Sequence, residues 1–354
     1  MLPRVTIRDV AERAACGVST VSRVLNASGP ASPDVRERVL TAARELGFEF
    51  SEIGRSLQSR RSNTLAVLVP SLRNDVFAMA IEGGQKAAAA AGYQMLLSCV
   101  NYDEDSEIEA IRTLIAKGID GAVLTVANPD DSAALDCLER HGVPYCLLFN
   151  QPTNPVASLG VDNVAAARMV AERLHAAGHR EVGFVALGFR ASERSRLRYE
   201  GFCEGLKKNG HADAHLLEAT NDPQRFQSQI AAFASDHPQM TAIFASNDLL
   251  ALSCIRALAR SGLRVPEDIS VVGFDGIDTG ELVTPSLATI VTPNAEMGRM
   301  AVIRVIDMIR SGNRTSSGRD FLPFHFRSGD SLGARRMQDT DGRAATRPSA
   351  CPSP

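Results

Sequence analysis

Apolar positions recur at helical spacing in two short segments near the start of the chain. The first has Thr6 as a candidate N-cap, followed by an apolar face of Ile7, Val10, Ala11 and Ala14. The second has an apolar face of its own, made of Val21, Val24 and Leu25. Its other side chains are small, polar or cationic: Val18, Ser19, Ser22, Arg23 and Asn26. The pattern predicts two amphipathic helices that pack together and leave one face of the second exposed.

After residue 63 the pattern changes to apolar runs that alternate with helical segments. Such runs predict buried strands in parallel βαβ units. The first series is Leu65 to Val69, Tyr93 to Ser98, Gly121 to Val126 and Pro144 to Phe149. The second series is Glu181 to Leu187, Thr241 to Ala245, Ile269 to Phe274 and Ser286 to Val291. Two parallel sheets predict two α/β lobes, with ligand binding outside the carboxyl ends of the strands.

The exposed face of the second helix has the chemistry needed to read DNA. A helix in the major groove needs a guanidinium for guanine edges, and hydroxyls or amides for phosphates and adenine. Arg23 supplies the guanidinium, and Ser19, Ser22 and Asn26 supply the other groups. This segment therefore favours a DNA-binding head, with an ordinary helical hairpin and a solvated face as the alternative.

Two motifs in this segment resemble the helix-turn-helix head of the lactose/galactose repressor (LacI/GalR) family. The family head begins T-I-x-D-V-A and continues into T-V-S-R-V-L-N; Thr6 to Ala11 and Thr20 to Asn26 match, and a third helix is expected from Ser32 to Phe48. The turn differs, because Gly17 stands where a Ser usually caps the recognition helix, and Gly caps almost as well. The resemblance implies a DNA-contact set of Thr6, Val18, Ser19, Thr20, Ser22, Arg23 and Asn26.

The rest of the chain resembles the sensor domain of the same family, which has the fold of periplasmic sugar-binding proteins. Matching segments include Val161-Asp162-Asn163, Arg198-Tyr199-Glu200-Gly201-Phe202, Ser246-Asn247-Asp248 and Val265 to Asp275. The resemblance covers residues 5 to about 333 and implies that a small molecule binds between the lobes. It places the effector contacts at Phe77, Arg198, Asn247 and Asp275.

These residue types suit a sugar, whose hydroxyls meet amides, carboxylates and guanidinium groups and whose apolar face stacks on an aromatic ring. The alternatives are a structural salt bridge for Arg198 and Asp275, and a helix cap for Asn247. Three further arginines lie nearby in the sequence: Arg190, Arg194 and Arg196. Either all three face solvent, or one turns inward and favours an anionic ligand such as a sugar acid. Asn150 stands where the family often has an Asp, so that contact is not carried over.

The resemblance places a hinge helix in residues 50–62. Arg55-Ser56-Leu57 matches the end of the family's hinge, where a Leu wedges into the minor groove and kinks the DNA. Arg55 and Leu57 therefore join the expected DNA contacts. Gly54 weakens a short helix, so we expect the hinge to fold only on DNA, with a plain linker as the alternative.

These patterns divide the chain into a head (1–49), a hinge (50–62), a two-lobed sensor (63–333) and a disordered tail (334–354). The first lobe is expected to span about 63–161 and 292–321, and the second about 162–291 and 322–333. At 354 residues and 44% hydrophobic, the chain can form these cores. Residues 1–62 hold ten Arg, no Lys and seven Asp or Glu, a balance of +3, so the total of −3 leaves −6 for the rest. Only the head is biased toward a polyanion.

Composition also narrows the function class. There is no apolar run of about 18 residues and no signal-peptide pattern, so a soluble, cytoplasmic protein is expected. The seven cysteines have neither metal-ligand spacing nor a disulfide pattern, and Cys16 is expected to pack the head. His175 and His179 have the spacing of metal ligands on a helix, but Gly178 interrupts it, so no metal site and no cofactor are expected.

An enzyme, or a ligand-binding protein on the same fold, is the alternative, but no nucleophile elbow, phosphate loop or metal-binding helix motif is present. The tail lacks the Leu heptads that would join two dimers, so a homodimer is expected. The family match implies a repressor that binds a near-palindromic double-stranded DNA operator. It also implies that a sugar or sugar acid controls the operator affinity, with no membrane partner.

Overall fold

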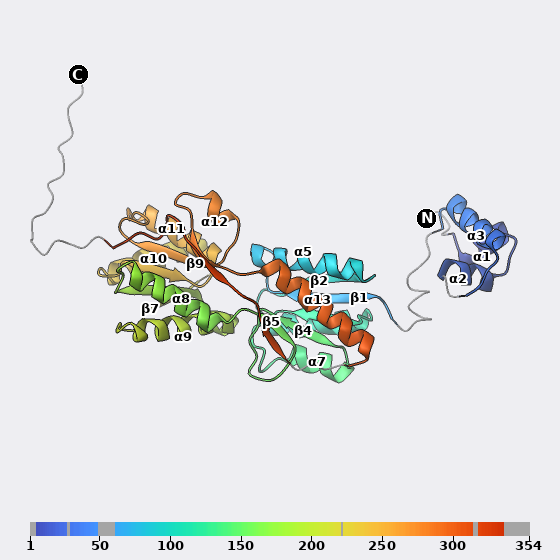
Figure 1. Cartoon of the computed structure of the whole chain (residues 1–354), viewed down its shortest axis with the longest axis horizontal. Coiled ribbons are helices and arrows are strands. Elements are labelled where there is room, and N and C mark those ends of the chain that lie inside the picture. The colour runs from blue at the N-terminus through green and yellow to red at the C-terminus, as the bar shows by residue number, and fades with distance from the viewer. Residues whose placement is uncertain (1–4, 27–28, 49–60, 221, 314–317, 336–354) are drawn as a thin grey trace, which may run out of the picture.

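The chain forms a small helical head and a larger two-lobed body (Figure 1). The computed structural model describes residues 5–335, apart from 27–28, 49–60, 221 and 314–317. Arg55, Leu57 and most of the predicted hinge lie outside the described residues, as does the tail from residue 336.

The head consists of three helices: α1 (Ile7–Arg13), α2 (Val18–Asn26) and α3 (Pro33–Leu46). They share a core of their own, formed by Val10, Ala11, Ala14, Val21, Val24, Val39, Ala42 and Ala43. Helix α3 begins with Pro33 after the extended residue Ser32, and it ends at Gly47, whose φ of 62° is in the left-handed region. Proline at the first position and glycine after the last are typical helix boundaries. The two amphipathic helices and the third helix are confirmed.

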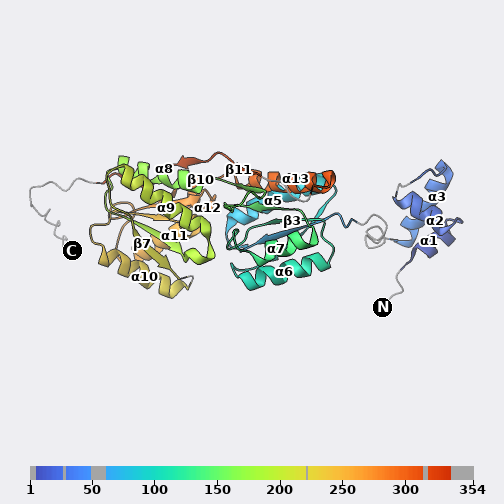
Figure 2. The ribbon, with the colours of Figure 1, turned by 90° about the horizontal axis from the view of Figure 1, so that it is seen from below.

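The first lobe is a parallel sheet in the order β11-β5-β4-β3-β1-β2. The strands are β1 (Thr64–Val69), β2 (Gln94–Cys99), β3 (Gly121–Leu124), β4 (Tyr145–Leu148), β5 (Ser158–Gly160) and β11 (Arg319–Phe321). One face is covered by α5 (Asp75–Ala90) and α13 (Asn294–Ser311), and the other by α6 (Glu104–Ala116) and α7 (Ala133–His141). Figure 2 shows this three-layer arrangement.

The second lobe repeats the arrangement in the order β12-β10-β9-β8-β6-β7, with only β12 antiparallel. The strands are β6 (Val182–Leu187), β7 (His215–Ala219), β8 (Ala242–Ala245), β9 (Ser270–Asp275), β10 (Ala288–Val291) and β12 (His325–Arg327). Helices α8 (Asn163–Ala176) and α9 (Glu193–Lys208) cover one face, and α10 (Pro223–Asp236) and α11 (Asp248–Arg260) cover the other. The short helices η1 (Phe189–Ala191) and α12 (Thr279–Leu282) lie in its loops.

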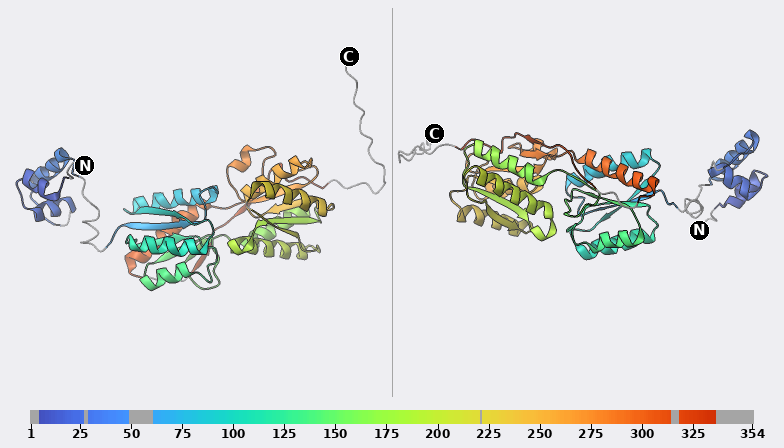
Figure 3. Two further views of the ribbon diagram at one scale, coloured as in Figure 1. Left: turned by 180° about the vertical axis from the view of Figure 1, so that it is seen from behind. Right: turned by 60° about the horizontal axis from the view of Figure 1, so that its bottom comes forward.

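The chain passes between the lobes after β5, after β10 and after β11 (Figure 3). Each lobe is therefore built from segments far apart in the sequence. The eight predicted strands all occur, whereas the short or edge strands β5, β7, β11 and β12 were not predicted. The predicted class, a helix-turn-helix head plus two parallel α/β lobes, is confirmed. In the part of the chain that the structure describes, no helix is long and apolar enough to cross a membrane.

Helices α5 and α13 pack so closely that their backbones are in contact. A Cβ added to Gly83 would lie 1.9 Å from the Ala295 carbonyl oxygen, and one added to Gly298 would lie 1.9 Å from that of Ala80. Only glycine permits this approach, so the two helices form one tightly packed unit. The body begins on this unit, because the Arg61 guanidinium donates to the Ile309 carbonyl near the end of α13 (3.1 Å).

Candidate DNA-binding face and interlobe site

Helix α2 presents the predicted DNA-reading residues on its outer face. Val18 is 42% exposed, Ser19 and Arg23 are exposed, and Thr20 and Ser22 are half-buried. Asn26 belongs to the helix, but its side chain lies outside the described part of the chain. The predicted inner face is buried, with Val21 fully enclosed and Val24 4% exposed. The amphipathic division of this helix is as predicted, while its DNA contacts stay a prediction.

The starts of α1 and α2 are fixed by different groups. The amide and the hydroxyl of Thr6 both donate to the Asp9 carboxylate, at 2.7 and 2.8 Å, and these bonds lower the pKa of Asp9. Gly17 uses only its backbone, since its carbonyl accepts from Thr20 N (2.9 Å) and Val21 N (3.1 Å). Gly17 therefore occupies the N-cap position that the sequence assigned to it.

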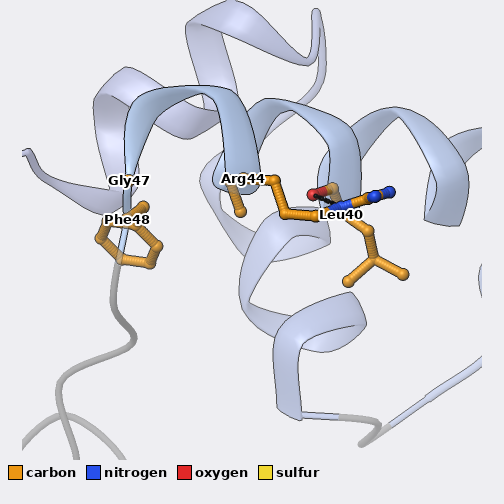
Figure 4. Close-up of a pocket in the computed structure, with 5 residues that line it drawn as sticks. Leu40, Arg44, Gly47 and Phe48 are labelled. Carbon is orange, nitrogen blue, oxygen red and sulfur yellow. Dashed lines mark hydrogen bonds between the residues drawn. The ribbon is translucent and has the colours of Figure 1, made fainter.

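A hollow of about 440 Å³ lies at the end of α3. Figure 4 shows Leu40, Arg44, Gly47 and Phe48 around it, with the Arg44 Nε–H donating to the Leu40 carbonyl (3.3 Å). Its lining is mainly apolar and includes none of the predicted DNA-contact residues. It is thus separate from both candidate sites.

Side chains from both lobes meet where the parallel strands end. We call the following residues the interlobe cluster: Asn74, Phe77, Tyr102, Phe149 and Asn150 from the first lobe, and Glu193, Arg194, Arg198, Ser246 and Asp275 from the second. They lie at or just after the ends of β1, β2, β4, β8 and β9, or in the first two turns of α5 and α9. The carboxyl ends of parallel strands are the usual ligand-binding edge of such sheets. The cluster is therefore the candidate effector site.

Arg198 and Asp275, both predicted effector contacts, form a buried ion pair with 3.7 Å between Nη1 and Oδ1. The guanidinium also donates from Nε to Asn163 Oδ1 (2.8 Å) and from Nη1 to the Ser246 carbonyl. Its carbon lies 3.5 Å from the centre of the Phe274 ring, a cation–π distance. The sequence did not predict Asn163 as the partner that orients Arg198.

Burial raises the pKa of Asp275 to about 6, although Arg198, Arg194 and a hydrogen bond from Asn74 act in the opposite direction. The backbone of Asp275 is also strained, with a φ of 117°. Phe149 and Tyr102 have positive φ values of 69° and 60°. Left-handed backbone is rare for such residues, and strain of this kind concentrates at functional sites.

The other two predicted effector contacts are placed differently. Phe77 is 2% exposed and packs edge-on against Phe149, with 5.5 Å between ring centres. The Asn247 side chain accepts from Leu250 N (2.9 Å) and caps α11. The alternative of a helix cap is therefore realised for the Asn247 oxygen, and any effector contact would fall to its amide nitrogen.

Asn150 and Glu193 connect the lobes. The Asn150 amide bonds both backbone groups of Val126 at 2.9 Å, and it also donates to Glu193 Oε1 (2.9 Å). The backbone N–H of Gln151 donates to the same oxygen (3.0 Å). Asn150 thus binds the Glu193 carboxylate, which belongs to the opposite lobe.

Arg194 turns inward, whereas Arg190 and Arg196 are exposed, so the second of the two alternatives left open by the sequence is realised. Arg194 is 6% exposed. Burial raises the pKa of Tyr102, and the charge of Arg194 and a hydrogen bond from it act in the opposite direction. Three buried atoms of the cluster have no hydrogen-bond partner among the described residues: Glu193 Oε2, Arg194 Nη1 and Ser246 Oγ. Buried polar atoms are normally satisfied, so these three indicate a site for a polar ligand.

Two further buried carboxyls lie beside the cluster. Asp248 accepts from the amides of Gly276 and Ile277 (2.8 Å each) and so fixes the turn after Asp275. Burial raises the pKa of Asp248 to about 7. Glu107 is 2% exposed and accepts from Ala127 N (2.8 Å), and burial raises its pKa to about 7 as well.

Replacing Glu107 by glutamine should flatten the pH dependence of stability. A carboxyl with a raised native pKa holds a proton that the unfolded chain has released, so its stabilisation is lost as the pH rises from about 4 to 7. Glutamine keeps an acceptor for Ala127 N but does not titrate. The melting temperature of Glu107→Gln should therefore fall less over this range than that of the unmodified protein. Glu109→Gln, an exposed change on the same helix, is the control. Parallel curves for Glu107→Gln and the unmodified protein would contradict the assignment.

The histidines do not form the metal site considered from the sequence. His179 is buried between Thr241 Oγ1 (2.9 Å) and the Gly333 carbonyl (3.0 Å), while His175 lies 2.7 Å from His211. Over the described residues, no group of three His, Cys, Asp or Glu side chains is placed to hold a metal ion.

Comparison with known proteins agrees with this architecture. Residues 6–50 match the family described as bacterial regulatory proteins, lacI family, and residues 62–326 match the periplasmic binding proteins and sugar binding domain of LacI family. The transcriptional regulator GntR of Escherichia coli K12 is 30% identical over 332 residues, 93% of this chain and 99% of that protein. The transcriptional repressor CytR of the same strain is 31% identical over 317 residues, 88% of this chain and 92% of that protein.

The fold also matches that of a solved regulator. The Lac repressor dimer bound to operator and the anti-inducer ONPF has a TM-score of 0.85 and 26% identity, over 94% of this chain and all of that one. The head, the two-lobed body and the matches to both family descriptions agree. The chain therefore belongs to the LacI family of bacterial transcriptional regulators, with a DNA-binding head followed by a sugar-binding sensor domain.

Proposed function

We propose that this regulator represses transcription by binding a near-palindromic operator as a homodimer, and that a sugar or sugar acid bound at the interlobe cluster controls its operator affinity. The observation that carries the proposal is the set of buried polar atoms without partners that lies between the two lobes. The lobes are connected by three segments of the chain. A ligand that contacts both lobes can favour one lobe arrangement over another. The Lac repressor dimer was solved with an operator and an anti-inducer bound together, which supports separate sites for DNA and for a small molecule.

Within this proposal the head (1–49) binds DNA, the hinge (50–62) joins it to the sensor (63–333), and the effector contacts are Phe77, Arg198, Asn247 and Asp275. The head reads bases through Val18, Ser19, Thr20, Ser22, Arg23 and Asn26, with Thr6, Arg55 and Leu57 as further DNA contacts. We place the protein in the cytoplasm, where its operator would be, and assign it no catalytic activity.

The sensor half of the proposal is tested by titrating sugars and sugar acids into a complex of the protein with an operator selected from random DNA. Release or tightening of the complex by a compound that binds the protein alone supports effector control. A protein that binds its operator equally with and without every bound compound would contradict it.

Replacing Arg23 by alanine should weaken binding to the selected operator by about 1–3 kcal/mol per half-site and leave binding to random DNA nearly unchanged. The reason is that an exposed guanidinium on this helix can make two hydrogen bonds to a guanine edge. Fluorescence anisotropy at fixed salt measures both affinities.

Arg23→Lys is the matched variant, because lysine keeps the charge but cannot make the paired hydrogen bonds. Base reading predicts that Arg23→Lys also loses operator preference. Full preference in Arg23→Lys, or equal losses on operator and random DNA in Arg23→Ala, would assign Arg23 to a phosphate instead.

A further inference from the structure

Arg194 is a buried guanidinium without a carboxylate partner. It is 6% exposed, and no carboxylate of the described residues forms an ion pair with it. Its Nη1 has no hydrogen-bond partner, while the guanidinium does bond to Tyr102. A buried charge is unfavourable unless a counter-charge accompanies it. An anion from outside the chain would therefore be stabilised at this position.

The other charged groups of the cluster have partners for most of their polar atoms. Arg198 uses its nitrogens for Asn163, the Ser246 carbonyl and Asp275. Glu193 Oε1 accepts hydrogen bonds from the Asn150 side chain and from the backbone N–H of Gln151. Of the two buried arginines in the interlobe cluster, Arg194 is the one with a buried nitrogen that lacks a hydrogen-bond partner among the described residues.

The start of α9 adds to the attraction for an anion. The helix runs for 16 residues from Glu193, and Ser192 caps it through a bond from Ser195 N (3.4 Å). Its positive end therefore lies beside Arg194. The first-turn residues Glu193, Arg194 and Ser195 are all buried, so solvent screens this end little.

Two other buried atoms of the interlobe cluster also lack partners. Glu193 Oε2 can accept a hydrogen bond, and Ser246 Oγ can donate or accept one, so both suit hydroxyl groups. We infer that the effector is a polyhydroxylated carboxylic acid, a sugar acid, whose carboxylate is bound by Arg194. The inference rests on the proposed function, because it assigns a ligand class to the same interlobe cluster.

The test compares acids with neutral compounds that differ only at the carboxylate. Calorimetric titration of the full-length protein uses the pairs D-gluconate and D-glucitol, D-glucuronate and D-glucose, and D-galacturonate and D-galactose. We expect at least one acid to bind 10-fold or more tightly than its neutral counterpart, since a carboxylate pairs with the buried guanidinium and a hydroxymethyl group does not.

Arg194→Gln should remove most of that preference, and Arg194→Lys should restore part of it. Arg196→Gln is the control, because Arg196 lies on the exposed side of the same helix and pairs with Glu200 (2.7 Å). The melting temperature of free Arg194→Gln protein should stay close to that of the unmodified protein, since the loss of the bond to Tyr102 and of the attraction to Asp275 is offset by removal of a buried charge that has no ion-pair partner. A purely structural Arg194 would instead give a lower melting temperature.

Neutral compounds that bind as tightly as their acids would overturn the inference, as would an acid preference that survives Arg194→Gln. Failure of every acid to bind would overturn it as well. If a neutral sugar alone binds and changes operator affinity, the proposed effector control stands and the assignment of an acid falls.

Discussion

Replacing Arg198 by methionine should lower the free energy of unfolding of the sensor by about 3–5 kcal/mol at neutral pH, because it leaves Asp275 as a buried charge without its ion-pair partner. Methionine keeps an apolar chain against the Phe274 ring, so the loss reports mainly on the charge and its hydrogen bonds. Urea unfolding measures the change.

The double variant Arg198→Met with Asp275→Asn separates the causes. If the unpaired carboxylate dominates, the second change should recover a large part of the loss, and lowering the pH toward 5 should recover part of it in the single variant. No recovery in either case would attribute the loss to the bonds from Arg198 to Asn163 and the Ser246 carbonyl.

The same pair should be required for effector response. Arg198→Met and Asp275→Asn should each abolish the effect of ligand on operator binding and leave the ligand-free operator affinity close to that of the unmodified protein, because the head has a core of its own. Arg196→Met on the same helix is the control. Unchanged ligand affinity in both variants would mean that the effector binds elsewhere.

Replacing Gly83 by alanine should destabilise the first lobe by about 2–4 kcal/mol. The added methyl group would lie 1.9 Å from the Ala295 carbonyl oxygen, and because that oxygen belongs to the backbone, α13 must move away as a whole. The expected result is a lower melting temperature of the sensor, measured by calorimetry.

Gly84→Ala is the matched control on the same helix. Its methyl group would meet Val302 Cγ2 at 3.0 Å and the Gly298 carbonyl oxygen at 3.3 Å, contacts that small shifts can relieve. Both substitutions gain about 1 kcal/mol of helix propensity, so the difference between them reports the cost of the 1.9 Å overlap at Gly83 relative to the 3.3 Å approach at Gly84. Equal melting temperatures for the two variants would show that α5 and α13 do not touch at Gly83.

The sequence predicted the parts of the fold that have strong periodicity. Seven of the eight predicted strands are buried almost throughout, and burial on both faces leaves a continuous apolar pattern. The eighth, β2, is a mostly exposed edge strand, and it was predicted because Met95, Leu96 and Leu97 are apolar. Strands β5, β11 and β12 have three residues each, too few to show any period. Strand β7 lies at a sheet edge and is only partly buried, so its composition does not distinguish it from a loop.

The site residues that lie in family motifs were predictable from the sequence. The orientation of residues outside those motifs was less predictable, because packing determines it. Arg198 and Asp275 came together, but the inward turn of Arg194 depends on the rotation of α9 about its axis. A signal was available, because Arg194, Arg198, Gly201, Phe202 and Gly205 follow helical spacing and are all buried. The links from Asn150 to Glu193 and from Asn74 to Asp275 join different lobes, and no local pattern encodes them.

Helix α13 connects the interlobe cluster to the C-terminal end of the hinge (50–62). At its start, Thr292 and Asn294 donate to the Asp275 carbonyl at 3.1 and 3.2 Å, and near its end Ile309 holds Arg61, which directly follows the segment that joins the head. Its 18 residues span about 27 Å, and a helix hardly shortens under load. A tilt of about 4° at Asp275 would therefore move the Ile309 end of the helix, and Arg61 with it, by roughly 2 Å.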